Sequence, residues 1–232
     1  MRDDRRLAAI GLVGGLGPAA TVFYYRELLR MLKAAKLAPA IFIAHANVSY
    51  VLEAIAGDRL EEVAGYLGGL LASLEVAGAG ITAITAVGPH IAAQYLSPSK
   101  ARRIDLIETM LAAIEELGVR RIALLGPKKV VETALFGRLD RFEVVMPHAS
   151  VIERLHELYF GIVRDEAAPA SVVNELEEIA LGLHDCGAEA VVLAGTELSL
   201  AFDPARERGF PVLDAGRLHI DAIVRALRVA EE

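Results

Sequence analysis

The chain has 232 residues, of which 54% are hydrophobic and 24% charged, and its mean hydropathy of +0.42 excludes an intrinsically disordered protein. The formal net charge of −7 at pH 7 argues against a general affinity for nucleic acid or for an anionic membrane surface. Because 6% of the residues are aromatic and none is Trp, we expect a core of Ala, Val, Ile and Leu, as in buried parallel sheets.

Short apolar runs bounded by Gly or Pro alternate with longer stretches of helical periodicity. This alternation predicts an α/β fold in which parallel strands carry helices on both faces. The predicted elements, in chain order, are a strand at Leu7 to Val13, a helix at Ala20 to Ala35, a strand at Ala40 to Ala44, a helix at Val51 to Glu75, a strand at Gly80 to Ala86, a helix at Ser99 to Leu117, a strand at Arg121 to Leu125, a helix at Glu132 to Leu139, a strand at Phe142 to Met146, a helix at Ala170 to Cys186, strands at Ala188 to Leu193 and Pro211 to Leu213, and a helix at Arg217 to Ala230.

A weak internal repeat relates the two halves of the chain. The segment from Arg5 to Gly14 resembles Arg120 to Gly126, and Gly78 to Ala86 resembles Gly187 to Gly195 at nearly the same offset. The alternative is chance similarity between buried βα units. The repeat favours two pseudo-symmetric, Rossmann-like lobes with parallel sheets.

The expected first lobe comprises residues 1–98 together with 209–232, and the expected second lobe comprises residues 99–208. In such a pair, loops after corresponding strands are expected to face each other across a cleft. Ala86 and Gly195 would then lie on opposite sides of that cleft.

A glycine-rich loop follows the first predicted strand. Gly14, Gly15 and Gly17 allow a close backbone approach to a ligand, and Pro18 suits the first position of a helix whose amides attract a carboxylate or phosphate. The spacing matches neither a Walker A loop nor G-x-G-x-x-G. The loop, which ends at Thr21, is therefore either an anion site or a tight turn without a ligand.

Two further loops carry polar groups directly after buried strands. Thr196 and Glu197 follow the strand ending at Leu193, where they could bind an amino group or relay a proton, or could cap the next helix. His90 follows the corresponding strand of the first lobe. A single His there is either a structural hydrogen-bonding residue or a proton-transfer group.

The single cysteine, Cys186, cannot form an intramolecular disulfide, and no His/Cys pair has metal-ligand spacing. We therefore expect a cytoplasmic protein without a metal. The longest uncharged stretch, between Glu75 and Lys100, is interrupted by glycines and Pro89, which argues against a membrane span.

Four segments, in this order, resemble the aspartate/glutamate (Asp/Glu/hydantoin) racemase superfamily. They are Gly14 to Thr21, Asn47-Val48-Ser49-Tyr50 followed by Gly57-Asp58, Leu193 to Leu198, and Gly209 to His219. The resemblance implies two α/β lobes, a small amino-dicarboxylate or related acid in the cleft, no cofactor, and a homodimer. The substrate-binding residues that it implies are Gly14, Gly15, Gly17, Thr21, Asn47, Ser49 and Thr196.

The sequence departs from the chemistry that this resemblance implies. Racemases of the superfamily move the α-proton with two cysteines, one from each lobe. Aligned on their motifs, Ala86 and Gly195 occupy those two positions here, and Cys186 precedes its strand at a predicted helix end. Neither alanine nor glycine can transfer a proton, so we predict no two-cysteine racemisation.

Three hypotheses follow from these residues. The protein binds a small carboxylic or amino acid without racemising it. Alternatively, it is a cofactor-independent isomerase or lyase that uses other acid/base groups. A third possibility is a nucleotide or phosphate site built from Gly14 to Gly17 and from Gly126 to Lys129. The acid/base candidates for the second hypothesis are Glu197, His90, Thr85 and Thr196.

Overall fold

The structure, a computed structural model, describes residues 8–229, which form two units, each with a four-stranded parallel sheet. The first unit contains the described chain up to Ile107 and from His219 on, and the second contains Glu108–Leu218. The predicted α/β fold with parallel sheets is confirmed. The ends of two predicted elements, Leu7 and Ala230, and the beginning of the repeat lie outside the described residues.

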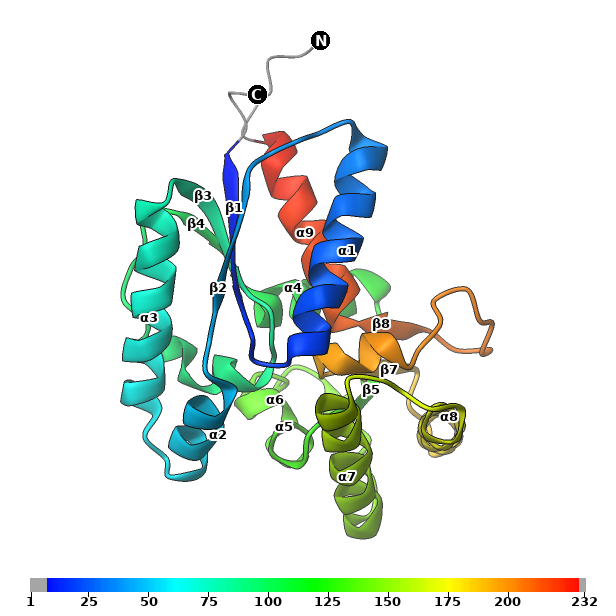
Figure 1. The fold of residues 1–232 in the computed structure, drawn as a ribbon. Coiled ribbons are helices and arrows are strands. Elements are labelled where there is room, and N and C mark those ends of the chain that lie inside the picture. Colours follow the sequence, from blue (N-terminus) through cyan, green and yellow to red (C-terminus); the bar gives the residue numbers. More distant parts are fainter. Residues whose placement is uncertain (1–7, 230–232) are drawn as a thin grey trace. The chain divides into compact units, whose positions relative to one another are not determined.

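The sheet of the first unit has the strand order β2-β1-β3-β4 (Figure 1). Its strands are β1 (Ala9–Gly14), β2 (Ile41–His45), β3 (Ala79–Ile84) and β4 (Arg102–Ile104). Every neighbouring pair is parallel. All carboxyl ends of the strands therefore lie at one edge of the sheet, where ligands of α/β proteins bind.

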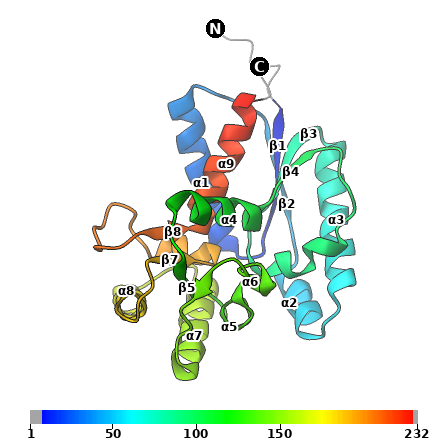
Figure 2. The ribbon, with the colours of Figure 1, turned by 180° about the vertical axis from the view of Figure 1, so that it is seen from behind.

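Helices cover both faces of this sheet, because successive side chains of a strand point to opposite faces. Leu12 packs in a cluster with α1 (Pro18–Ala35) and α9 (Ala215–Val229), whereas the adjacent Val13 packs against α3 (Leu60–Val76). Both views show α1 and α9 side by side and α3 on the other side of the sheet (Figure 2).

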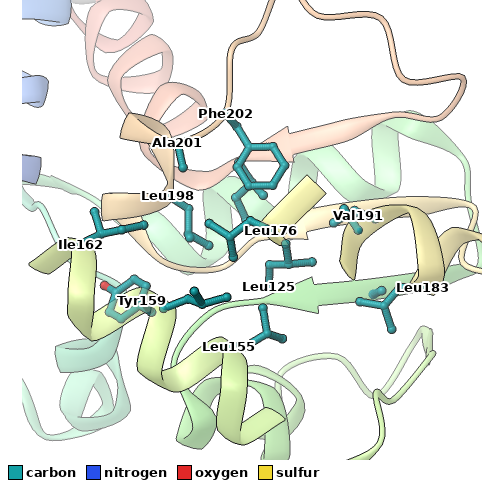
Figure 3. Packing of buried hydrophobic residues seen from close by; sticks show 14 of the residues in the cluster. Leu125, Leu155, Tyr159, Ile162, Leu176, Leu183, Val191, Leu198, Ala201 and Phe202 are labelled. Carbon is teal, nitrogen blue, oxygen red and sulfur yellow. The ribbon is translucent and has the colours of Figure 1, made fainter. Parts of the chain in front are cut away.

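The sheet of the second unit repeats the arrangement of the first. Its order is β6-β5-β7-β8, from β5 (Arg121–Leu125), β6 (Glu143–Val144), β7 (Ala190–Leu193) and β8 (Val212–Asp214). The repeated sequences thus form equivalent strands, β1 with β5 and β3 with β7. Helices α7 (Ala149–Asp165) and α8 (Ala170–Asp185) pack against this sheet in one apolar cluster (Figure 3).

All seven predicted strands are present, but three predicted helices were wrong in part. The helix predicted from Ser99 begins as the edge strand β4, and α4 starts later (Leu106–Leu117). The helix predicted at Val51 to Glu75 is two helices, α2 (Val48–Ala56) and α3, because the chain turns at Asp58, whose φ is +56°. The third, predicted at Glu132 to Leu139, contains the last residue of α5 (Lys128–Glu132) and the short α6 (Ala134–Gly137), in which Leu135 and Phe136 have non-helical backbone angles.

The predicted elements omit one long helix and two short ones. The long helix is α7, although its buried residues Ile152, Leu155, Leu158 and Ile162 recur at three and four positions. The short ones are the 3-10 helices η2 (Gly88–Tyr95) and η3 (Thr196–Leu200), which directly follow β3 and β7. They hold His90 and Glu197 at the ends of these strands.

Candidate functional site

In the first unit, the segments that follow β1, β2 and β3 lie together. The Ala46 amide donates to the Gly14 carbonyl over 2.8 Å, and the Thr85 amide donates to the Val13 carbonyl over 3.0 Å. The predicted glycine loop, Asn47 and Thr85 are thus held at one edge of the sheet, as parallel strands require.

The glycine loop is closed by its own threonine. Gly15 has φ +79°, which favours glycine, and a Cβ there would lie 2.7 Å from the Ala46 carbonyl oxygen. The Gly15 amide donates to Thr21 Oγ1 over 2.8 Å, and this hydroxyl donates to the Gly17 carbonyl over 3.2 Å. The predicted ligand group Thr21 therefore stabilises the loop that begins α1.

Two other predicted binding residues begin α2. Asn47 is its N-cap residue, and its side-chain oxygen accepts from the Tyr50 amide over 3.2 Å. Ser49 is exposed in the first turn. The structure thus gives Asn47 a capping role and leaves the binding role of Ser49 as a prediction.

The polar groups after β3 bond to backbone carbonyls. The Thr85 hydroxyl donates to the Val13 carbonyl over 3.1 Å, and His90 Nδ1 donates to the Ala86 carbonyl over 2.8 Å. With its proton on Nδ1, a neutral His90 carries its lone pair on Nε2. Burial lowers the pKa of His90, opposed by the Asp105 charge, so the ring is neutral at physiological pH.

In the second unit, Glu197 is a deeply buried carboxyl group just beyond β7. The side chain of Glu197 is 1% exposed, and Oε2 accepts from the Tyr159 hydroxyl and, over 3.3 Å, from the Thr196 hydroxyl. Its second oxygen, Oε1, is buried and has no hydrogen-bond partner. Burial raises the pKa of Glu197, and the bonds from Tyr159 and Thr196 partly oppose that rise.

The Tyr159 ring fills the space into which a side chain at position 195 would project. Gly195 has an extended backbone, with φ −161°, that any residue adopts. A Cβ there would collide with ring carbon Cε2 and lie 3.1 Å from Cδ2 and 3.2 Å from Cζ. Tyr159 comes from α7 and is packed in the apolar cluster with Leu198 and Ile162 (Figure 3).

Tyr159 is the site residue that sequence analysis missed. Burial, followed by the Glu197 charge and hydrogen bond, raises the pKa of the phenol well above its ordinary value, so Tyr159 keeps its proton. Ser199 and Asp214 were also missed as a pair; the Ser199 hydroxyl donates to Asp214 Oδ1 over 2.7 Å.

Lys128, the first of the two lysines after β5, is already paired with carboxylates. Lys128 Nζ pairs with Glu153 and lies 3.9 Å from Glu132. The helix that begins there, α5, spans five residues and so offers little alignment of peptide dipoles. These contacts weaken the hypothesis of a nucleotide site.

The comparisons with known proteins agree with the fold. The family model of the Asp/Glu/hydantoin racemases matches residues 13–223. The chain belongs to this family. A comparison with curated proteins found no match.

Solved structures of racemase-like proteins share the fold of this racemase-family chain. A proposed Asp/Glu racemase from Yersinia pestis is 21% identical with a TM-score of 0.81, and the match covers 97% of this chain and 100% of that one. An aspartate racemase homologue from Pyrococcus horikoshii OT3 is 24% identical with a TM-score of 0.74, at the same coverage. A glutamate racemase from Thermus thermophilus, in complex with beta-chloro-D-alanine, is 19% identical with a TM-score of 0.65, covering 97% of this chain and 82% of that one.

The one cysteine of this family member precedes β7 and so does not lie at the carboxyl end of that strand. Cys186 is exposed and forms the C-cap of α8, before β7 begins. Within residues 8–229, no three His, Cys, Asp or Glu side chains are grouped so that they could hold a metal ion. No helix of this described part combines the length and the apolar character that a membrane crossing needs.

Proposed function

We propose that this racemase-family protein binds a small carboxylic or amino acid, in the predicted cleft, without two-cysteine racemisation. The observation that carries the proposal is the environment of Gly195, where the Tyr159 ring occupies the space of a side chain. A thiol at this position would have no room, and Cys186 is at an exposed helix end.

Glu197 supports the binding of a ligand at the same strand end. Leaving a buried polar atom without a partner costs about 1–3 kcal/mol, and Oε1 is such an atom. A ligand that donates a hydrogen bond to Oε1 would recover this free energy. This supports a ligand site beside η3.

A ligand-stabilisation screen tests the proposal. The purified protein is heated with dicarboxylates, amino acids or nucleotides, and the melting temperature is measured. We expect a concentration-dependent increase with a dicarboxylate or an acidic amino acid, because binding to the folded state alone stabilises it. Stabilisation by nucleotides alone would contradict the proposal and would support the phosphate-binding hypothesis.

A second candidate function is a cofactor-independent isomerase or lyase. It is favoured by the neutral His90, which carries a lone pair on Nε2, and by the raised pKa of Glu197. Both are features of proton-transfer groups. Thr85 and Thr196 contribute less to this candidate, since their hydroxyls already donate to Val13 and Glu197.

The family and the composition also support a proposal on the location and the oligomeric state of the protein. We propose a cytoplasmic homodimer, with neither metal nor cofactor. Sedimentation of the purified protein at several concentrations would measure the oligomeric state.

A further inference from the structure

We infer that the edge strand β2 of the first unit pairs with β2 of a second copy of this chain, in antiparallel orientation about a two-fold axis. This inference rests on the homodimer of the proposed function and names its interface. The first-unit sheets of the two copies would then form one continuous sheet.

The first step concerns the open edge of β2. Within residues 8–229, β1 is the single strand that neighbours β2. The Ala40 carbonyl accepts from β1 and the Ala46 amide donates to the end of β1, so the backbone groups of the even-numbered residues face that strand. Because successive residues alternate, the N–H and C=O groups of Ile41, Ile43 and His45 point to the open edge.

The second step compares β2 with the other strands at sheet edges. β4, β6 and β8 span three, two and three residues, and each contains at least one charged residue. Short length and charge are devices that protect an edge from pairing with another chain. β2 spans five residues in continuous register with β1, and the sequence has no Asp, Glu, Lys or Arg between Lys36 and Glu53. The edge of β2 therefore lacks both protections.

The third step concerns the partner that this edge fits. The antiparallel register that pairs all five residues of β2 centres the two-fold axis on Ile43. Ile43 then exchanges both backbone hydrogen bonds with the partner subunit's Ile43, and Ile41 lies opposite the partner's His45. The outward backbone groups of β2 thus complement those of an identical strand, and no acidic or basic side chain of β2 meets its own copy across the axis.

The fourth step concerns the size of the interface. Ile41 packs in the cluster that contains Tyr24 and Leu28 of α1, so Ile43, two residues further on, points to the face that α1 covers; it is 43% exposed. A stable interface buries about 800 Å² per partner, which is more than a short strand edge alone provides. Opposite residues of an antiparallel pair point to one face, so both α1 helices lie on the same face of the joined sheet. α1 exposes further apolar side chains that can enlarge the interface, namely Val22, Tyr25 and Leu29.

Disulfide cross-linking tests the pairing and its register. Ile43→Cys is introduced into the Cys186→Ser chain, which lacks the exposed native thiol, and the protein is oxidised and analysed on a non-reducing gel. We expect most chains to migrate as a linked dimer, because opposite Cα atoms of a hydrogen-bonded pair lie about 5.5 Å apart, within reach of a disulfide. Val76→Cys in the same background is the matched control, since Val76 is an exposed apolar residue at the end of α3, and it should remain unlinked.

The variant Ile43→Lys tests the energetics of the same contact. Two ammonium groups would lie directly opposite each other at the axis, so we expect the dimer dissociation constant to rise at least about tenfold. Sedimentation at several concentrations measures this constant, and circular dichroism checks that the variant is folded. Val76→Lys is the matched control and should leave the constant unchanged.

The possible failures are distinguishable. A wild-type dimer that does not cross-link at position 43, or whose dissociation constant Ile43→Lys leaves unchanged, would overturn the inference and leave the proposed homodimer intact. A monomeric wild type would overturn both the inference and the homodimer. The ligand-stabilisation screen would still test the ligand part of the proposed function in either case.

Discussion

Gly195→Ala is expected to lower the free energy of unfolding by about 2 kcal/mol, since overpacking a well-filled core costs roughly 1–3 kcal/mol. The new methyl group would collide with the Tyr159 ring, which is packed in the apolar cluster that contains residues of α7 and η3. Gly195→Cys should be at least as destabilising. Urea denaturation at pH 7 measures the difference.

A matched glycine in the same unit provides the control. Gly182 lies in α8, and outside the adjacent backbone of this helix no described atom lies within 4 Å of an added Cβ, so Gly182→Ala should be stabilising by up to about 1 kcal/mol. The double variant Gly195→Ala with Tyr159→Ala should lose less unfolding free energy than the sum of the losses in the two single variants. A Gly195→Ala protein as stable as the wild type would show that the ring does not fill this space.

Acidification is expected to destabilise the first unit through His219. This side chain is fully buried; Nε2 donates to the Ile104 carbonyl over 2.8 Å, and Nδ1 accepts from the Tyr24 hydroxyl over 3.0 Å. Burial, aided by the nearby His90, lowers the pKa of His219 from 6.5 to about 4, although the Ile104 bond opposes this. Between pH 6.5 and pH 4, His219 therefore binds a proton in the unfolded chain more readily than in the folded protein.

The sign and the size of the effect follow from linkage. Between pH 6.5 and pH 4 the unfolded chain binds more protons at His219, so the free energy of unfolding falls as the pH falls. A shift of one pKa unit corresponds to about 1.4 kcal/mol, so His219 lowers the free energy of unfolding by about 3 kcal/mol between pH 6.5 and pH 4. Denaturant titrations at pH 7, 5.5 and 4 measure it.

His219→Gln keeps one donor and one acceptor but does not titrate. Its loss of stability between pH 6.5 and pH 4 should be smaller than that of the wild type by about 3 kcal/mol. Tyr24→Phe removes a bond to the same ring without removing the titrating group, so its pH dependence should persist. Identical pH profiles for His219→Gln and the wild type would contradict the assigned role of His219.

The sequence predicts the fold well because each strand carries a local signal. Leu12 and Val13 alternate between the two faces, and glycines end the strands, so the strand positions and the ends that hold Gly14, Thr196 and Glu197 are predictable. The internal repeat also predicts that both sheets share one strand order.

The structure supplies what no local pattern contains. The contact between Tyr159 and Glu197 joins α7 to η3 across 38 positions of sequence, and nothing in either segment indicates the other. The turn at Leu135 and Phe136, with φ of +57° and +61°, is likewise unpredictable, because apolar residues rarely adopt left-handed conformations. Tertiary packing decides both features.

Deuterium exchange at the α-carbon of a bound amino acid shows whether the protein transfers the α-proton. The wild-type protein is incubated in D₂O with L-aspartate or L-glutamate at a concentration that raises its melting temperature, and the α-proton signal is followed by NMR. Because neither Ala86 nor Gly195 offers an acid or a base, we expect ligand binding with no deuterium incorporation above the uncatalysed rate. Incorporation above that rate would contradict this expectation and would assign proton transfer to other groups, with Glu197 and His90 as the first to replace.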